Sequence, residues 1–600
     1  MKRCFLVAQE DVDVMALIRE MKAGDAVLPL TPAAQATCVN KFGNVRYLSQ
    51  FVPHQRICEL ALRAQELLVQ LTAEACQGAT LDGIDWLQVF IEDQKLLYFR
   101  EVLMAQELAP HLGAEFEEII FLGMPNISPD APLHGFIEVL KLHLRERVAT
   151  WSHLLVKRNN GMLRKAQKKL GAGFRRLNNF LSSSVEPVGV CKGIGVFSTS
   201  QWERFTEPLL ELRDLYGDQF QIWYLGPIPG ELHAWANEAA LRVTTIPYPE
   251  RVDRDVREFF NDHWNRWILH RRHELARKTG CPCFSNEAFL PFLEQLFNYT
   301  LPRTVQWARS LRRFLRRASP EWILGSAAFT YMSKFPYYVA KKMDIPSIAL
   351  SHTSVSGDYG VVPATYLVCR NLFERKGYQG SFVDDGSILY CRNSSNRLSY
   401  VANDSMSIPE RHRPIVAVLT APATGNGSVM PWTDDARFVT TLKTLANPSQ
   451  DLSDLDFIFK SHPRFDISSF LQRVVVAPNV RVLPAQASVT ELLEKAWVIV
   501  VCNHYGSVVA EVAMSGKPIL FLDSAHFFYP YIDPMGFAAG EVVKDMDTFW
   551  RLLKNIKVSP EVYSRLAERC QSFSSRYLQP STLTLAEQFK ILENRKIRVG

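Results

Sequence analysis

From residue 186 onward, short apolar runs of strand length alternate with amphipathic runs of helix length. Val498–Cys502 and Ile519–Leu522 are two such apolar runs, and residues 506–515 between them have the length of a helix. Strands separated by helices at this spacing predict βαβ units and a parallel sheet. The polar, proline-containing segment 400–413 divides the alternation into two series. We therefore predict an α/β fold with two consecutive Rossmann-like, doubly wound domains that face a cleft.

A chain of 600 residues is too long for one hydrophobic core, so several domains are expected. The first 150 residues contain strand-like runs at Arg3–Ala8, Ala26–Leu30, Val45–Phe51 and Glu118–Leu122, which indicate further α/β structure. The predicted segments are an N-terminal α/β extension (1–155), a basic connector (156–185), a first Rossmann-like domain (186–405) with a helical insertion (254–318), a second Rossmann-like domain (410–576) and a C-terminal helix (577–600).

Composition and charge exclude several classes of protein. Hydrophobic residues make up 47% of the chain and charged residues 22%, which is typical of a globular protein. A formal net charge of +6 is small for this length and does not indicate a nucleic-acid-binding protein. The eleven cysteines are scattered, and the only close pair, Cys281-Pro-Cys283, lacks a metal-site spacing, so a reducing compartment is expected. Because neither a signal peptide nor an apolar stretch of about 18 residues is found, we predict a cytoplasmic protein.

Ligands of parallel sheets bind beyond the carboxyl ends of the strands, so polar residues directly after strands are candidates. The apolar run Phe457–Phe459 leads into a turn that gathers Lys460, Ser461, His462, Pro463 and Arg464. The proline stops the strand, the arginine offers a planar fork, and the lysine is a point charge, which together suit a phosphate. The alternative is a solvated loop with a proline stop.

The run Val498–Cys502 ends in a second turn made of Asn503, His504, Tyr505, Gly506 and Ser507. A helix predicted to begin near Ser507 would direct its first N–H groups and the positive end of its dipole at the turn, which favours an anion. Glu511 lies one helical turn further on the same face, where its carboxylate can accept hydrogen bonds from ribose hydroxyls. We predict that Asn503, Gly506, Ser507 and Glu511 hold a nucleotide. An ordinary βαβ unit with an N-capping serine would explain Ser507 alone.

Two further segments follow strand-like runs. The loop after the first strand of the second domain contributes Thr420, Gly425, Gly427 and Ser428, whose glycines allow the backbone to approach a ligand closely, although no Walker A pattern follows. In the first domain, the run Ser347–Ser351 leads to His352 and then to Asp358. Either side chain could act as a general base toward a hydroxyl, so both are candidate catalytic residues, and the choice between them stays open.

These four segments together resemble GT-B glycosyltransferases of bacterial surface polysaccharide synthesis, including CMP-sugar (Kdo- and sialyl-type) and CDP-glycerol transferases. The resemblance covers about 186–594: His462 and Pro463 match a His-Pro pair after a donor-domain strand, and Gly506 and Ser507 match a small-residue turn. The segment Glu511–Pro518 resembles the helix whose glutamate holds the ribose, and His352 resembles a histidine after an acceptor-domain strand. The family's His-Gly is His352-Thr here, and its Ser-Ser is Gly506-Ser507.

The resemblance implies a metal-independent enzyme that moves a sugar, such as Kdo from CMP-Kdo, onto a capsule or lipopolysaccharide glycan. Residues 186–405 would then be the acceptor side and 410–576 the nucleotide-sugar donor side. Asp-x-Asp pairs at 253–255, 454–456 and 545–547 do not follow strands, so neither a metal nor another cofactor is expected. The arginine-rich segment 303–317 has an apolar stripe; with 157–176 it could lie on an anionic membrane near a lipid-linked acceptor, or the stripe could face the core.

Two other functions fit the same two-domain arrangement. A nucleotide-sugar 2-epimerase would need several acidic groups in the cleft for proton abstraction, and the acceptor-side segments contain few. A non-catalytic glycan-binding or assembly protein would keep the fold without turnover.

Overall fold

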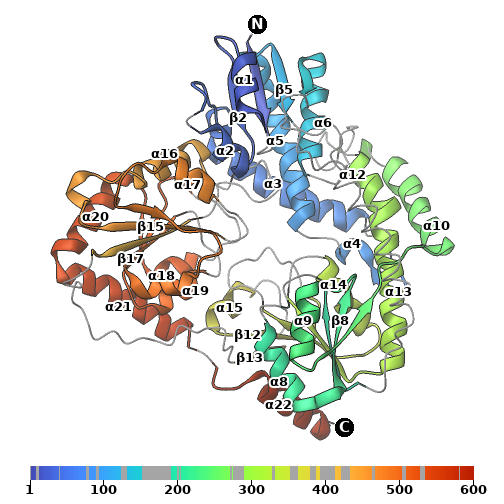
Figure 1. Cartoon of the computed structure of the whole chain (residues 1–600). Helices are drawn as coiled ribbons and strands as arrows, with labels where there is room; N and C mark the ends of the chain where they lie inside the picture. The colour runs from blue at the N-terminus through green and yellow to red at the C-terminus, as the bar shows by residue number, and fades with distance from the viewer. Residues whose placement is uncertain are drawn as a thin grey trace.

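A computed structural model of the chain contains three parallel β-sheets, formed by successive parts of the sequence (Figure 1). The structure describes the chain apart from residues 1, 9–11, 40, 76–79, 90–92, 123–131, 152–190, 199–201, 203–204, 271–272, 275–276, 278–289, 328–330, 352–361, 379–386, 392–412, 421–430, 432, 463–466, 503–507, 527–533, 580 and 600. The predicted basic connector and Cys281-Pro-Cys283 therefore lie outside the described residues.

The N-terminal unit is built on a four-stranded parallel sheet of order β2-β1-β5-β6. Its strands are β1 (Arg3–Val7), β2 (Ala26–Pro29), β5 (Glu118–Leu122) and β6 (Val148–Trp151). Its helices are α1 (Val14–Glu20), α2 (Pro32–Cys38), α3 (His54–Ala75), α4 (Trp86–Val89), α5 (Asp93–Glu115) and α6 (Pro132–Leu144). Every residue of β1 is buried, as expected for an inner strand of a parallel sheet covered on both faces.

One strand predicted in this unit is wrong. Within Val45–Phe51, only Val45 makes an isolated bridge, to Val27, and Leu48–Gln50 form a 3₁₀ turn, η1. The segment leaves the sheet because its next residues are hydrogen-bonded to the C-terminal unit, as described below.

The middle unit has a seven-stranded parallel sheet of order β13-β12-β11-β10-β7-β8-β9. Its strands are β7 (Gly193–Phe197), β8 (Phe220–Leu225), β9 (Arg242–Ile246), β10 (Trp322–Ser326), β11 (Ser347–Leu350), β12 (Tyr366–Cys369) and β13 (Ile388–Tyr390). Its helices are α8 (Thr206–Tyr216), α9 (Gly230–Glu238), α10 (Arg254–His263), α12 (Leu290–Gln295), α13 (Leu301–Ala318), α14 (Tyr331–Lys341) and α15 (Leu372–Gly377). Numbered within the unit, the first six strands have the order 3-2-1-4-5-6 of a dinucleotide-binding sheet.

The C-terminal unit repeats this order in a six-stranded parallel sheet, β16-β15-β14-β17-β18-β19. Its strands are β14 (Ile415–Thr420), β15 (Asp456–Ser461), β16 (Val480–Val482), β17 (Ala496–Cys502), β18 (Ile519–Leu522) and β19 (Glu541–Val543). Its helices are α16 (Asp435–Leu445), α17 (Ser468–Val474), α18 (Val489–Lys495), α19 (Val508–Met514), α20 (Met546–Val558) and α21 (Pro560–Tyr577).

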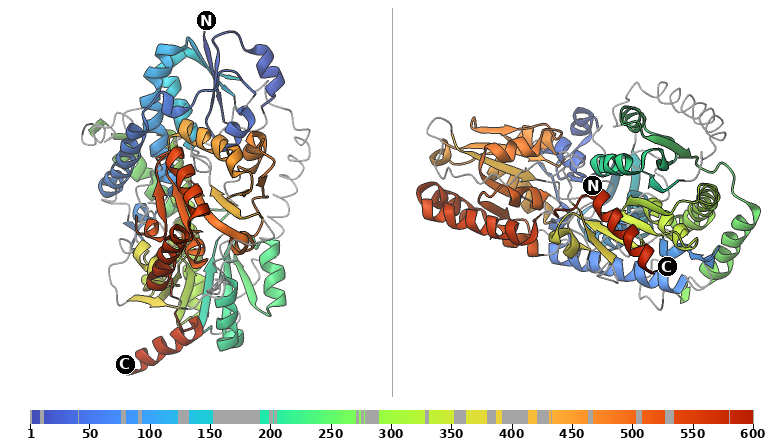
Figure 2. Two further views of the ribbon diagram at one scale, coloured as in Figure 1. Left: turned by 90° about the vertical axis from the view of Figure 1, so that its left-hand side faces the viewer. Right: turned by 90° about the horizontal axis from the view of Figure 1, so that it is seen from below.

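The chain then returns to the middle unit. The last helix, α22 (Leu585–Val599), packs on α8, and Figures 1 and 2 show it beside the middle unit instead of the C-terminal sheet. Glu211 accepts a hydrogen bond from Leu585 N at 2.9 Å, and the Tyr390 carbonyl accepts one from Ser581 Oγ at 3.1 Å. Two doubly wound sheets, a returning C-terminal helix and an N-terminal α/β extension confirm the predicted GT-B fold class.

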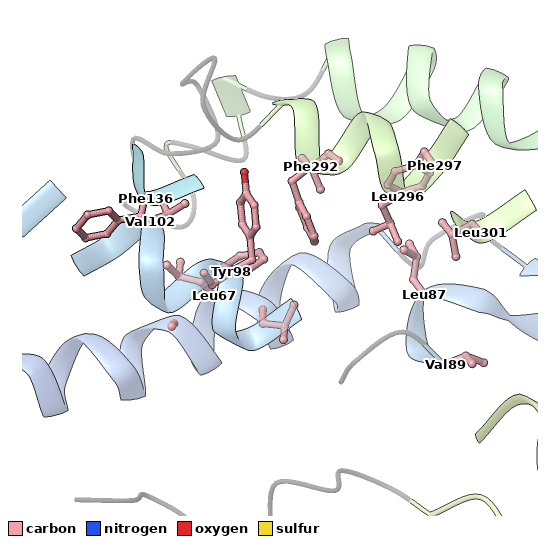
Figure 3. Close-up of a cluster of buried hydrophobic side chains, with 14 of the residues drawn as sticks. Leu67, Leu87, Val89, Tyr98, Val102, Phe136, Phe292, Leu296, Phe297 and Leu301 are labelled. Carbon is pink, nitrogen blue, oxygen red and sulfur yellow. The ribbon is translucent and has the colours of Figure 1, made fainter. Parts of the chain in front are cut away.

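The N-terminal unit shares a hydrophobic core with the middle unit. We call the contact formed by Leu87, Tyr98, Phe99, Phe292 and Leu296 the apolar seam; all five side chains are buried. The rings of Tyr98 and Phe292 stack with centroids 4.3 Å apart, and Figure 3 shows Leu87 pointing toward Leu296. These residues belong to one continuous cluster that spans both units, so the two units form one packed body.

The contact of the N-terminal unit with the C-terminal unit is more polar. We call the group formed by Leu48, Ser49, His54, Asp434 and Asp435 the polar seam. The buried Asp435 carboxylate accepts hydrogen bonds from Leu48 N and Ser49 N, each at 3.0 Å, and from Ser49 Oγ at 2.6 Å. Burial raises the pKa of Asp435, although its bonds from Ser49 and Leu48 favour the ionised form. Helix α2 also packs on α17, and the buried Val39 belongs to the hydrophobic core of the C-terminal unit.

The arginine-rich segment 303–317 lies in α13, and its apolar stripe faces the protein interior. Val305, Trp307, Leu311 and Leu315 are buried, so this stripe is not available to lie on a membrane. Arg309 pairs with Asp82 of the N-terminal unit at 2.7 Å. The core-facing alternative is therefore the one observed.

Candidate functional site

The predicted ligand-binding turns leave one edge of the C-terminal sheet. Strand β14 has β15 and β17 as its two neighbours, and Thr420, its last residue, is in register with both Ser461 and Cys502. All three strands are parallel, so β15 and β17 end at the same carboxyl edge on either side of the end of β14. This is the position where the strand order reverses, at which open α/β sheets bind their ligands.

His462 lies at this edge, directly beside the end of β14. Its backbone N–H donates to the Thr420 carbonyl at 3.0 Å, and the residue is half-buried. The hydrogen bond extends the β14–β15 ladder by one residue and fixes where the turn begins. The structure thus brings two of the predicted site residues, Thr420 and His462, into contact.

Lys460 precedes them, with its side chain held inside the unit. Its ammonium donates to the Ala485 carbonyl at 2.8 Å and to the Ser461 carbonyl at 3.3 Å, and the residue is buried. Ser461 Oγ lies 3.1 Å from Ser468 Oγ at the start of α17. These contacts tie the end of β15 to the neighbouring backbone, so Lys460 could reach a ligand only by exchanging bonds to carbonyls.

Glu511 lies in α19, which begins at Val508 directly after the predicted anion-binding turn. The residue is half-buried, and its charge acts on Arg370 of the middle unit. A residue predicted to hold a ribose is therefore within electrostatic range of the facing sheet. The other predicted residues lie outside the described residues: His352, Asp358, Gly425, Gly427, Ser428, Pro463, Arg464, Asn503, Gly506 and Ser507.

The facing edge of the middle sheet carries a buried charged cluster that the sequence reasoning missed. Glu374 in α15 is fully buried, and one of its oxygens accepts hydrogen bonds from Ser351 Oγ and Arg370 N, each at 2.6 Å. The other oxygen binds the Arg370 guanidinium through Nε and Nη2. Ser351 follows β11 and Arg370 follows β12, so Glu374 links the carboxyl ends of two neighbouring strands.

This arrangement holds Arg370 as a fixed cation at the edge. Burial opposes its charge, but the carboxylate of Glu374 and, at longer range, Glu511 and Tyr378 outweigh burial and raise the pKa of Arg370. Its side chain as a whole keeps 23% of its surface exposed. Because Nε and Nη2 bind the same carboxylate oxygen while the other oxygen accepts from Arg370 N and Ser351 Oγ, the Glu374 carboxylate fixes the position of Arg370 as well as its charge.

A sequence signal for this cluster existed. Asn371 caps α15 by accepting a hydrogen bond from Glu374 N at 3.0 Å, and an Asn with a Glu three residues later is a typical helix start. In a capping box, the glutamate would turn back to the cap residue. Here its side chain binds Arg370 and Ser351 instead, which the spacing alone does not predict.

The Asp-x-Asp pairs have structural partners. Asp253 and Asp255 both pair with Arg309, Asp456 pairs with Arg481, and Asp545 caps α20. In the described ranges, no group of three or more His, Cys, Asp and Glu side chains is placed to hold a metal ion. Nor is any described helix both long and apolar enough to cross a bilayer. Metal independence stays a prediction.

No family model matches the chain, and no curated protein does. Among solved structures, UDP-GlcNAc 2-epimerase from Neisseria meningitidis bound to UDP-GlcNAc is 12% identical over 68% of this chain and 99% of its own, with a TM-score of 0.41. MurG from Acinetobacter baumannii is 12% identical over 68% of this chain and 99% of its own, with a TM-score of 0.38. HepE from Anabaena in complex with UDP is 10% identical over 68% and 99%, with a TM-score of 0.40. Similarity at this level says nothing about substrate or residue roles.

Proposed function

We propose that the protein transfers a sugar from a nucleotide-activated donor to a glycan acceptor, with the donor bound at the carboxyl edge of the C-terminal sheet. One observation carries the proposal. Strands β15 and β17, which lead to the turns at His462 and Ser507, end at this edge on either side of β14, and the charge of Glu511 acts on Arg370 of the middle unit. A donor placed there would have its nucleotide on one sheet and its sugar toward the other.

The proposed roles follow the chemistry of each side chain. His462, Arg464 and the turn at Ser507 would meet the charge of the leaving phosphate, and Glu511 would accept hydrogen bonds from the ribose. His352 or Asp358 would take the proton from the acceptor hydroxyl. We assign Lys460 a supporting role, because its ammonium already binds the Ala485 carbonyl. CMP is the nucleotide we propose first, with a Kdo-type sugar as donor group.

Thermal melting with CMP, CDP, UDP and GDP tests the donor site, since a ligand that binds only the folded protein raises its melting temperature. We expect one nucleotide to raise Tm far more than the others, and Glu511→Ala to abolish that rise. Glu568→Gln, an exposed change on α21, is the matched control and should respond like the wild type. Equal responses of the wild type and Glu511→Ala to every nucleotide would refute the site.

Turnover assays separate the competing functions. The wild type should release nucleotide from its donor only when a glycan acceptor is present, and His462→Ala should reduce kcat/KM by roughly 100-fold or more. The exposed His111→Ala serves as the control. Conversion of UDP-N-acetylglucosamine without any acceptor would instead identify an epimerase. Binding of nucleotide and glycan without turnover would identify a non-catalytic protein.

A further inference from the structure

Among the residues that the structure describes, buried cationic side chains are few, and nearly all of them have partners. Five cationic side chains of the described residues are buried: Arg3, Arg100, Lys334, Lys460 and Lys517. Arg3 pairs with the buried Asp25 at 2.7 Å, and Lys517 donates to the Leu493 and Glu494 carbonyls at 2.7 and 2.6 Å. Lys460 has the carbonyl contacts described above, and Lys334 has a partner as well.

Arg100 is the exception. The residue is 1% exposed, and its Nε and Nη2 atoms are buried without any hydrogen-bond partner. It lies in α5, next to Phe99 of the apolar seam and one turn before the buried Met104. No ion pair among the described residues joins Arg100 to a carboxylate, that of its buried chain neighbour Glu101 included.

A guanidinium group stays charged inside a protein, so the burial of Arg100 leaves a charge that needs a partner. A buried ion without a partner costs several kcal/mol by general estimates of desolvation. The chain compensates the same cost at Arg3 with a carboxylate that binds the guanidinium through both Nε and Nη2. These are the same two nitrogens that lack a partner at Arg100. A planar or tetrahedral oxyanion could accept hydrogen bonds from both of these nitrogens of Arg100, as the Asp25 carboxylate does at Arg3.

We propose that Arg100 is the recognition residue of an oxyanion site inside the N-terminal unit, distinct from the donor site on the C-terminal sheet. Its occupant is a phosphate or carboxylate group that takes two parallel hydrogen bonds from Nε and Nη2. The bound anion would offset the cost of the buried, unpaired guanidinium and so stabilise α5. The proposal does not depend on the proposed transferase function.

Melting curves with inorganic phosphate, acetate and chloride at matched ionic strength test it. In the wild type, Tm should climb steadily with each tenfold step of phosphate or acetate above Kd, and chloride should not reproduce the rise. A rise with phosphate alone identifies a phosphate site, and a rise with acetate identifies a carboxylate site. If the purified wild type already carries the anion, added phosphate or acetate would not raise Tm further. In that case, ion chromatography of the denatured protein should detect one released oxyanion per chain.

Arg100→Met keeps the size of the side chain and removes its charge. This variant should lose both the oxyanion-dependent rise and the released anion, and in chloride it should melt no lower than the wild type. Should it fail to fold, Arg100→Lys, which lacks the planar fork, should show a weakened rise. Arg3→Met is the matched control: it should melt lower, because it leaves Asp25 buried and unpaired, yet keep its response to the oxyanion.

The proposal is overturned if the wild type neither responds to nor releases an oxyanion, or if Arg100→Met responds as the wild type does. The nucleotide response should be unchanged in Arg100→Met. Loss of the oxyanion site and failure of the donor site are therefore distinguishable in one set of melting curves.

Discussion

The N-terminal unit binds its two neighbours in different ways. Against the middle unit it forms the apolar seam, in which stacked rings and aliphatic side chains belong to one core. Against the C-terminal unit it forms the polar seam, in which one carboxylate, Asp435, collects three hydrogen bonds from Leu48 and Ser49. Apolar burial stabilises in proportion to area and has little directional preference, whereas hydrogen bonds fix orientation for a small net free energy. The N-terminal unit thus shares a hydrophobic core with the middle unit, whereas hydrogen bonds fix its orientation relative to the C-terminal unit.

This difference has a consequence for the cleft. The middle and C-terminal sheets contribute opposite sides of the proposed site, and the N-terminal unit contacts both. The middle unit also packs on the C-terminal unit, where Phe373 of α15 contacts Phe573 of α21, so a movement of the C-terminal unit as a body would turn about this contact and strain the polar seam before the apolar seam. The following changes test whether the two seams differ in this way.

The largest effect is expected from Phe292→Ala in the apolar seam. Phe292 is buried and contacts both Tyr98 and Phe99, so truncation should lower the free energy of unfolding by about 3–5 kcal/mol. Urea denaturation followed by tryptophan fluorescence measures the change, with Trp86 of α4 as a buried probe. The control Tyr299→Ala, at a side chain 51% exposed, should stay within about 0.5 kcal/mol of the wild type. Equal effects of the two changes would contradict a shared core.

Asp435→Ala in the polar seam should cost less, about 2–3 kcal/mol, because it leaves the amides of Leu48 and Ser49 without their acceptor. The loss should be local. Hydrogen exchange should accelerate in η1 and leave the α5 amides of the apolar seam unchanged. The exposed Asp214→Ala provides the control. Faster exchange throughout α5 would mean that the two seams are coupled and that our comparison is wrong.

Ser49→Ala removes only the hydroxyl that the two carboxylates share. Ser49 Oγ lies 2.8 Å from Asp434 and 2.6 Å from Asp435, so its loss should cost about 1 kcal/mol. The backbone bonds of residue 49 to Asp435 remain in this variant. If Ser49→Ala lowered the free energy of unfolding as much as Asp435→Ala does, the hydroxyl and not the backbone donors would provide most of the stability of the polar seam.

The smallest effect concerns pH. Burial lowers the pKa of His54 below 6.5, against smaller opposing contributions from His526 and Asp434. The unfolded chain therefore binds the proton first, so the stabilisation present above pH 6.5 is lost as pH falls through the folded pKa. The protection factors of the η1 amides, which correct exchange for its intrinsic pH dependence, should fall on acidification in the wild type and much less in His54→Gln. If protection of the η1 amides depended on pH equally in both proteins, His54 would not be the cause of the pH dependence.

Much of the fold could be predicted because the strands are continuous apolar runs. Ile519–Leu522 and Glu118–Leu122 have the predicted bounds, since their side chains are buried on both sheet faces. The strand predicted at Val45–Phe51 was wrong because Leu48 in this segment is hydrogen-bonded to Asp435, 387 residues away in sequence. The local sequence pattern does not indicate so distant a partner. The strand Glu541–Val543 was missed because three residues give no period to detect.

The candidate site was predictable only in part. Strand ends are visible in sequence, so Thr420, His462 and Glu511 could be placed at one edge by topology. Arg370 and Glu374 could not, because their pairing depends on two strands lying side by side and on a side chain leaving its capping position. The inward direction of the Lys460 side chain could not be predicted either, because the carbonyl that accepts its hydrogen bond belongs to Ala485 in another part of the unit.

The return of α22 to the middle unit determines how the molecule would bear a mechanical load. Force applied to the two chain ends would enter through β1 and through α22, both seated on the pair of units fused by the apolar seam. The C-terminal sheet lies between these anchor points in sequence but outside the direct line of force. In an optical-tweezers experiment it should remain shielded until α22 peels from α8, and only then extend.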